Sequence, residues 1–147
     1  MSEHGECRGK RVDGKGWVYG WYCEQRICKP DGMLYLIHAT DKTYEVIPES
    51  VGQGTGKCVG GTEIFNGDIL RSFHFKDKHG KKHYLYHQVR WSPTYLSWMV
   101  CAKGEQDKPE DNRQGSPPLW VYLKNSLEVE VIGNTTDNPK LLEQENE

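Results

Sequence analysis

The chain has 147 residues, a formal net charge of −2, and 35% hydrophobic against 27% charged residues. This length fits one domain or two small subdomains. The nearly balanced charge excludes both a bulk phosphate binder and an acidic charge mimic. Eight tyrosines and five tryptophans predict an aromatic-rich core, because each ring can bury about 150–250 Å².

The termini and the cysteines bear on the compartment. The longest apolar run, Met33–Ile37, is too short to span a bilayer. The polar first residues lack the apolar segment of a secretory signal. Five scattered cysteines, an odd number, favour reduced thiols over a disulfide framework. We therefore expect a cytoplasmic protein with no membrane partner.

The first half of the chain has the pattern of antiparallel β-structure. Short runs rich in Val, Ile, Tyr and Trp alternate with glycine-containing turns. Arg11–Val12 and Trp17–Tyr19 flank the turn Asp13–Gly16 as the two arms of a predicted hairpin. Met33–Ala39 and Thr43–Ile47 are predicted as two further strands.

The best-defined local unit is a hairpin over Ile69–Trp91. With a two-residue loop at His79 and Gly80, Phe75 faces Tyr84 and Phe73 faces Tyr86 on one side of the hairpin. One extra loop residue would exchange the two faces of the hairpin.

The C-terminal third is predicted as strands interrupted by one long loop. Tyr95–Ala102 suits a buried strand, whereas Lys103–Pro118 has no large apolar side chain and is predicted as an exposed loop. Leu119–Leu123 and Leu127–Gly133 are predicted as two more strands. Helix is expected to be scarce, with at most a turn after Pro93 and another near Asn138–Leu142.

Three blocks of the sequence resemble the YopX family of phage-encoded proteins in order and spacing. They are GKRVDGKGWVYGWY at Gly9–Tyr22, YEVIPESVGQGTGK and GTEIFNGDIL within Tyr44–Leu70, and LEVEVIGNTTDNPKLL at Leu127–Leu142. The resemblance implies a phage or prophage origin, a mainly β fold, and an accessory protein without known cofactor or catalytic residues. It supplies no functional position to carry over.

We expect a mainly β protein of two parts. An N-terminal antiparallel β-meander (residues 1–62) packs on a small SH3-like barrel (63–142), followed by a disordered acidic tail (143–147). The Asn66-Gly67 turn delivers Asp68 at the start of an apolar strand, where its carboxylate can bond the backbone. We interpret Asp68 as structural.

Three histidines suggest a metal site. In the predicted hairpin register His74, His83 and His87 share a face, and with Asp68 they are the candidate centre of a metal-dependent hydrolase. Zinc would require their nitrogens to converge to about 2.0–2.1 Å from the ion. We favour the simpler interpretation of a solvated polar face, and we predict no metal and no other cofactor.

The cysteines give no sign of catalysis. Cys23 and Cys28 enclose four residues, which is longer than a zinc-knuckle turn, and no histidine or asparagine context marks a nucleophile. We interpret the thiols as buried or incidental and predict no catalytic residue.

A basic hairpin tip is the strongest nucleic-acid signal in the sequence. The candidate contacts are Lys76, Lys78, Lys81, Lys82 and Arg90. Such cations can follow phosphates while neighbouring rings stack on bases. Against this, an aspartate interrupts the cluster, and lysines at turns also keep hairpins soluble.

Three large rings alternate along one predicted strand. Trp17, Tyr19 and Trp21 therefore share a face, and they present more aromatic surface than one side of a small sheet usually hides. Core packing is one interpretation. The other is a protein interface, because tryptophan and tyrosine are concentrated at binding hot spots.

Together these patterns predict a non-catalytic accessory protein of the host bacterial cytoplasm. It is expected to act by self-assembly, as a homo-oligomer, and by binding a host or phage protein. The alternative is a nucleic-acid-binding module that uses the basic hairpin 73–91. A metal-dependent hydrolase ranks third.

Overall fold

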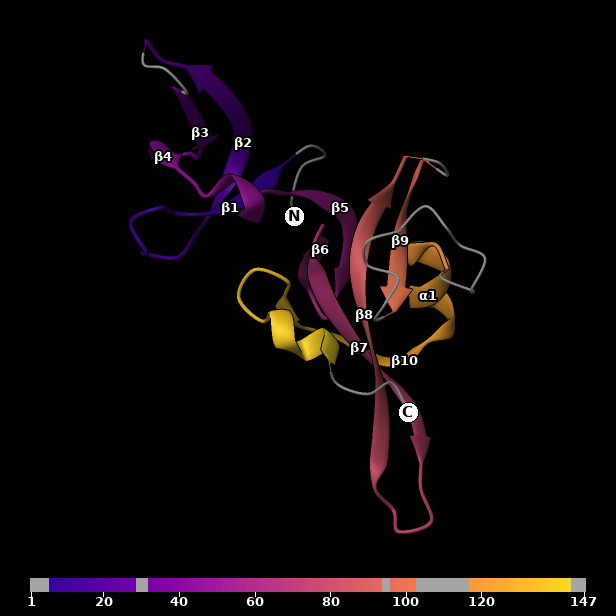
Figure 1. Ribbon diagram of the computed structural model, residues 1–147. Coiled ribbons are helices and arrows are strands. Elements are labelled where there is room, and N and C mark those ends of the chain that lie inside the picture. The colour runs from indigo at the N-terminus through magenta and orange to yellow at the C-terminus, as the bar shows by residue number, and fades with distance from the viewer. Residues whose placement is uncertain (1–5, 29–31, 94–95, 103–116, 144–147) are drawn as a thin grey trace. The chain divides into compact units, whose positions relative to one another are not determined.

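The computed structural model describes residues 6–28, 32–93, 96–102 and 117–143 (Figure 1). Within them the chain forms ten strands, one α-helix and two short 3-10 helices, so the predicted mainly β fold is confirmed. The chain divides into two compact units, Met1–Gly56 and Lys57–Glu147. No helix of the described part is long and apolar enough to cross a membrane.

The N-terminal unit is an antiparallel meander with a thin core. Its elements are β1 (Cys7–Lys10), β2 (Trp17–Arg26), β3 (Met33–His38), β4 (Thr43–Glu45), the 3-10 helix η1 (Pro48–Ser50) and the start of β5 (Gly52–Val59). Within this unit the strands are neighbours in the order β4-β3-β2-β1-β5. Ile37 and Val46 are the buried apolar side chains of the described part of this unit.

Strand β2 changes partners at Gly20. Its first four residues pair with β1, ending at the pair Cys7 and Gly20, and its last six pair with β3, beginning at Trp21 and His38. A Cβ atom at position 20 would lie 2.1 Å from the backbone oxygen of His38. Because only glycine lets the backbone of β3 come this close, Gly20 determines where His38 lies.

The C-terminal unit is built on a four-stranded antiparallel sheet. Its elements are β6 (Thr62–Phe65), β7 (Asp68–Lys76), β8 (Lys82–Ser92), β9 (Ser97–Ala102), α1 (Leu119–Asn125), β10 (Leu127–Asn134) and η3 (Pro139–Glu143). The sheet has the order β10-β7-β8-β9. The fully buried cluster comprises Ile64, Leu70, Val89, Val100, Leu119 and Tyr122.

The strand predicted over Leu119–Leu123 is wrong, because this segment forms α1. Leu119 and Tyr122 lie three residues apart on one helical face and are buried, whereas Trp120 is 57% exposed. A strand would have buried alternate residues instead. The described C-terminal strands form a four-stranded sheet of order β10-β7-β8-β9, and the predicted SH3-like barrel is not confirmed.

The hairpin predicted over Ile69–Trp91 forms as β7 and β8, but its loop has three residues rather than two. The amide of Gly80 donates to the carbonyl of Asp77 at 2.9 Å, and Gly80 has a φ of 82°, which is the usual form of a three-residue hairpin loop. One carboxylate oxygen of Asp77 also accepts hydrogen bonds from the amides of His79 and Lys81. The Asp77 side chain therefore favours the longer loop.

The predicted cross-strand partners of Phe73 and Phe75 are also wrong. The three-residue loop places Phe75 opposite His83, and a β-bulge at His74 shifts the register again, so that Phe73 lies opposite Tyr84. Because neighbouring residues of β8 point to opposite faces, the two phenylalanines lie on different sides of the hairpin. The Phe73 and Tyr84 rings form an edge-to-face pair at 6.4 Å, and the Phe75 and His83 rings stack at 4.5 Å.

Two predicted segments fall outside the described residues. These are the exposed loop over Lys103–Pro118, of which 103–116 are not described, and the acidic tail from residue 144 onward. The helical turn predicted near Asn138–Leu142 is confirmed as η3.

Candidate functional site

The three aromatic residues predicted as an interface lie at alternate positions of β2 but differ in environment. Trp17 is half-buried, and the guanidinium carbon of the buried Arg8 lies 4.9 Å from its ring centroid. Tyr19 and Trp21 are 47% and 50% exposed. Tyr19 and Trp21 therefore lie at the surface, whereas Trp17 packs against the guanidinium group of Arg8.

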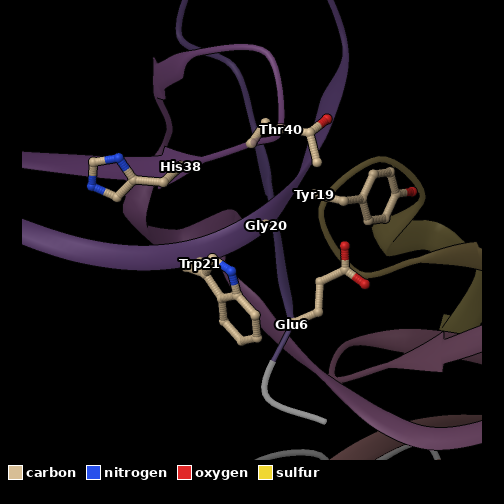
Figure 2. Close-up of a pocket in the computed structure, with 7 residues that line it drawn as sticks. Glu6, Tyr19, Gly20, Trp21, His38 and Thr40 are labelled. Atoms are coloured by element: carbon tan, nitrogen blue, oxygen red, sulfur yellow. The ribbon is translucent and has the colours of Figure 1, made fainter. Parts of the chain in front are cut away.

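Tyr19 and Trp21 border a hollow of about 410 Å³ in the N-terminal unit. Figure 2 shows their rings and the Glu6 carboxylate gathered around it. The remaining lining residues are Gly20, His38, Ala39 and Thr40. Two π faces beside one carboxylate form a surface that suits a cationic side chain, since aromatic rings attract cations and the carboxylate adds opposite charge.

A thiol and an imidazole meet on the strands next to this hollow. The Sγ atom of Cys23 lies 2.9 Å from Nε2 of His38, and Nδ1 of His38 lies 2.7 Å from Oγ1 of Thr43. Strands β2, β3 and β4 supply one residue each, and the pairing sets His38 directly opposite both Trp21 and Thr43. The three side chains form a continuous chain of polar contacts.

Sequence reasoning missed this contact and interpreted the cysteines as buried or incidental. Cys101 is buried, Cys28 and Cys58 are exposed, and Cys23 is half-buried. Cys23 and His38 lie 15 residues apart, so no local motif joins them. The one signal that could have found the pair is the register between β2 and β3.

The four hairpin lysines gather on a projecting arm. Among the described residues, β10 pairs with β7 only as far as Phe73, and β9 pairs with β8 only from His87 onward. Residues 74–86 therefore extend beyond the sheet as a two-stranded ribbon, here called the basic arm (Figure 1). Arg90 pairs with Met99 inside the sheet, about eight residues or roughly 26 Å along β8 from Lys82, so the structure separates it from the lysines.

Acidic groups neutralise part of the basic arm. The Oδ2 atom of Asp77 lies 2.9 Å from Nε2 of His83, and this hydrogen bond with those from backbone amides holds the pKa of Asp77 below its usual value. The Nζ atom of Lys82 lies 3.1 Å from Oε1 of Glu128, whose carboxylate raises the pKa of Lys82. Among the described residues no ion pair involves the arm's other lysines, which are Lys76, Lys78 and Lys81.

The candidate metal set does not come together. His83 is bonded within the basic arm, the His87 ring lies 5.4 Å from the Tyr122 ring, and His74 sits in the bulge. Asp68 is buried at the start of β7, where its carboxylate accepts a hydrogen bond from the backbone amide of Phe65 at 2.8 Å. Within the part of the chain that the structure describes, no three His, Cys, Asp or Glu side chains are arranged to hold a metal ion.

The fold has a counterpart among solved proteins. It is similar to the crystal structure of protein yopX from Bacillus subtilis, with a TM-score of 0.51 and 19% sequence identity over 97% of this chain and 99% of that chain. The family described as YopX protein matches residues 18–143. The chain therefore belongs to the YopX family, as its three sequence blocks indicated. None of the curated proteins matches it.

Proposed function

We propose that the protein is a non-catalytic phage accessory protein that acts in the bacterial cytoplasm by self-assembly and by binding a host or phage protein. The observation that carries this proposal is the aromatic hollow, where Tyr19 and Trp21 stay 47% and 50% exposed. Exposed large aromatic side chains around a concavity are typical of the hot spots of protein interfaces. In this proposal the hollow is the surface that binds the partner protein.

The chemistry of the hollow favours a partner that presents an arginine or lysine side chain. The indole of Trp21 and the phenol of Tyr19 offer π faces, and the Glu6 carboxylate offers a negative charge. At about 410 Å³ the hollow has the size of a small ligand pocket, so it has room for one long side chain.

An open sheet edge supports self-assembly. Among the described strands, β10 forms one edge of the C-terminal sheet, whereas the outer edges of β9 and β4 are partly covered, because the amide of Val100 donates to the carbonyl of Pro117 and the amide of Val12 donates to the carbonyl of Glu45. A strand edge exposes backbone groups on which a second copy can add. A thin core of the kind seen in the N-terminal unit gains stability when a copy covers it.

Native mass spectrometry of the purified full chain tests this function. Trp21→Ala is compared with Trp120→Ala, which removes an equally large, 57% exposed indole from α1. We expect the unaltered protein and Trp120→Ala to form oligomers and to retain the same protein from host extract. Trp21→Ala is expected to lose that protein. An unaltered chain that is monomeric and retains nothing, or equal retention by both variants, would contradict the proposal.

The basic arm supports a second candidate function, contact with nucleic acid. The arm carries four lysines and a single aspartate, and a two-stranded β-ribbon is narrow enough to enter the major groove of duplex DNA. If Lys76, Lys78 and Lys81 each neutralise one phosphate, affinity should fall about 40-fold between 50 and 200 mM salt.

Fluorescence anisotropy with a labelled DNA duplex measures this salt dependence. The triple alanine variant of the three unpaired arm lysines is expected to lose most of the binding. The control removes the same charge from exposed lysines elsewhere, namely Lys15, Lys124 and Lys140. Binding that ignores salt, or that falls equally in both triple variants, would rule out the arm as a nucleic-acid contact.

A further inference from the structure

We propose that Cys23 is the reactive thiol of this protein, with His38 as its proton acceptor and Thr43 as the positioning residue of the imidazole. The site reacts with small electrophiles such as hydrogen peroxide. This inference is independent of the proposed function, because it concerns a modification of the protein and needs neither a partner nor an oligomer.

The geometry meets the requirements for an activated nucleophile. Such a site has a nucleophile within hydrogen-bond reach of a base and a third group that orients the base. Here the Cys23 Sγ atom lies 2.9 Å from Nε2 of His38, and the other ring nitrogen lies 2.7 Å from the Thr43 hydroxyl oxygen. All three residues stand on paired strands, and strands hold side chains more accurately than loops do.

The hydrogen bonds of the three groups are compatible with proton transfer from Cys23 to His38. When the Cys23 thiol donates its proton to Nε2, the hydrogen on Nδ1 can donate to the Thr43 hydroxyl oxygen. After proton transfer, Nε2–H donates to the thiolate and Nδ1–H still donates to Thr43. The hydroxyl therefore accepts a hydrogen bond in both states, so the ring need not turn during the transfer.

Access and surroundings separate Cys23 from the other described cysteines. Cys23 is half-buried, while His38 and Thr43 are exposed, so a small reagent can approach the sulfur. Burial raises the pKa of Cys7 and so disfavours its thiolate. Cys101 is fully buried and Cys58 is exposed. Cys58 is the useful comparison, because in the described structure it has access without a histidine contact.

The reaction with hydrogen peroxide is a two-electron oxidation of sulfur. The Cys23 sulfur attacks one peroxide oxygen, so that an S–O bond forms while the O–O bond breaks. The thiol proton passes to His38 and then to the departing hydroxide, which leaves as water. The products are a sulfenic acid on Cys23 and one water molecule, with the peroxide as the group that is reduced.

The test measures sulfenic acid formation at each cysteine of the intact chain. The protein is treated with hydrogen peroxide in the presence of dimedone, which traps sulfenic acids, and the labelled peptides are quantified by mass spectrometry. We expect Cys23 to be labelled about tenfold faster than Cys58, and His38→Gln to lower the Cys23 rate about tenfold. The Cys58 rate in the same sample should stay unchanged, which makes it an internal control.

Two variants of Thr43 separate positioning from folding. Thr43→Val removes the hydroxyl but keeps the shape and should slow labelling of Cys23, whereas Thr43→Ser keeps the hydroxyl and should preserve the rate. If His38→Gln unfolds the N-terminal unit, Cys7 will also gain label, and the Thr43 pair then decides. Equal rates at Cys23 and Cys58 in the unaltered protein, or equal rates for Thr43→Val and Thr43→Ser, would overturn the proposal.

Discussion

Among its described residues the N-terminal unit buries two apolar side chains, Ile37 and Val46, whereas the C-terminal unit buries eleven. Both units are antiparallel sheets, so the difference lies in what covers them. Residues Leu119 and Tyr122 of α1 join the buried cluster of the C-terminal sheet. The stability of the chain therefore resides mainly in the C-terminal unit.

The same difference in buried apolar side chains bears on which unit carries exposed candidate functional side chains. A unit with few buried apolar side chains opens locally at a low free energy, and it leaves large or polar side chains at its surface. The aromatic hollow and the contact between Cys23 and His38 both belong to the N-terminal unit. In the C-terminal unit the basic arm, which extends beyond the sheet, carries a cluster of lysines.

The largest expected effect comes from the C-terminal core. Leu70→Ala should lower the free energy of unfolding by about 3–4 kcal/mol, because Leu70 is fully buried and its truncation leaves a cavity. Urea titration followed by fluorescence measures the change. Leu127→Ala, at a 64% exposed position, should change stability by less than about 0.5 kcal/mol. Similar values for both would show that the burial of Leu70 in the C-terminal core does not supply the expected stability.

A backbone clash should destabilise the N-terminal unit alone. Gly20→Ala places a methyl group against the His38 carbonyl and should lower stability by about 1–3 kcal/mol. Hydrogen exchange resolved by residue is the measurement, with faster exchange expected in β2 and β3 and no change in β7 and β8. Gln25→Ala, at an exposed position of β2, should leave both sets unaltered. Equal loss of protection in both units would show that they do not unfold separately.

A surface ion pair should contribute less. Arg71 pairs with Glu130 across β7 and β10, and its guanidinium carbon lies 4.3 Å from the Tyr84 ring centroid. A double-mutant cycle with Arg71→Ala and Glu130→Ala should give a coupling of about 0.2–1 kcal/mol, because both side chains are solvated. A coupling above that range would mean that the sheet edge is more rigid than its exposure suggests.

The smallest effect on overall stability should be the acid response of the arm turn. The pKa of Asp77 is held down mainly by the hydrogen bond with His83. A lowered pKa in the folded state stabilises the turn above the ordinary aspartate value of about 3.9. That stabilisation is lost as the pH falls through the lowered value. The amide shifts of His79 and Lys81, followed by NMR, should therefore change below that ordinary value.

Asp77→Asn is the control for this titration. The amide keeps a similar shape but cannot ionise, so the pH-dependent shift change at His79 and Lys81 should disappear. A midpoint at or above the ordinary aspartate value in the unaltered protein would mean that the hydrogen bonds to Asp77 are not maintained in solution.

Local patterns were sufficient to predict much of the fold. The alternation along Trp17–Trp21 and the aromatic hairpin over Ile69–Trp91 are short-range signals, and both segments are strands in the structure. The helix α1 was missed because Leu119–Leu123 consists of apolar residues that also suit strands. Packing of Leu119 and Tyr122 against the sheet outweighs that preference.

The site was harder to predict than the fold, because it depends on register. The shared face of Trp17, Tyr19 and Trp21 follows from alternation within one strand and was predicted, but the exposure of Tyr19 and Trp21 beside a half-buried Trp17 was not. The contact of Cys23 with His38 and Thr43 requires three strands in one alignment, which no local pattern specifies. The cross-strand partners in the hairpin were mispredicted for the same reason, since the third loop residue and the extra residue at His74 each shift the pairing.

The bulge at His74 also determines how the arm tolerates changes in its length. Phe73 and Phe75 are paired with adjacent residues of β8, so deleting His74 would leave every cross-strand partner in place and straighten the ribbon, since bulges bend a strand. A single deletion in β7 away from the bulge would instead move the residues between it and the turn to the opposite face. The direction of the arm can therefore change while the cross-strand pairing stays the same, because the bend depends on the single bulge residue His74. The face on which each arm side chain lies changes only when the pairing itself changes.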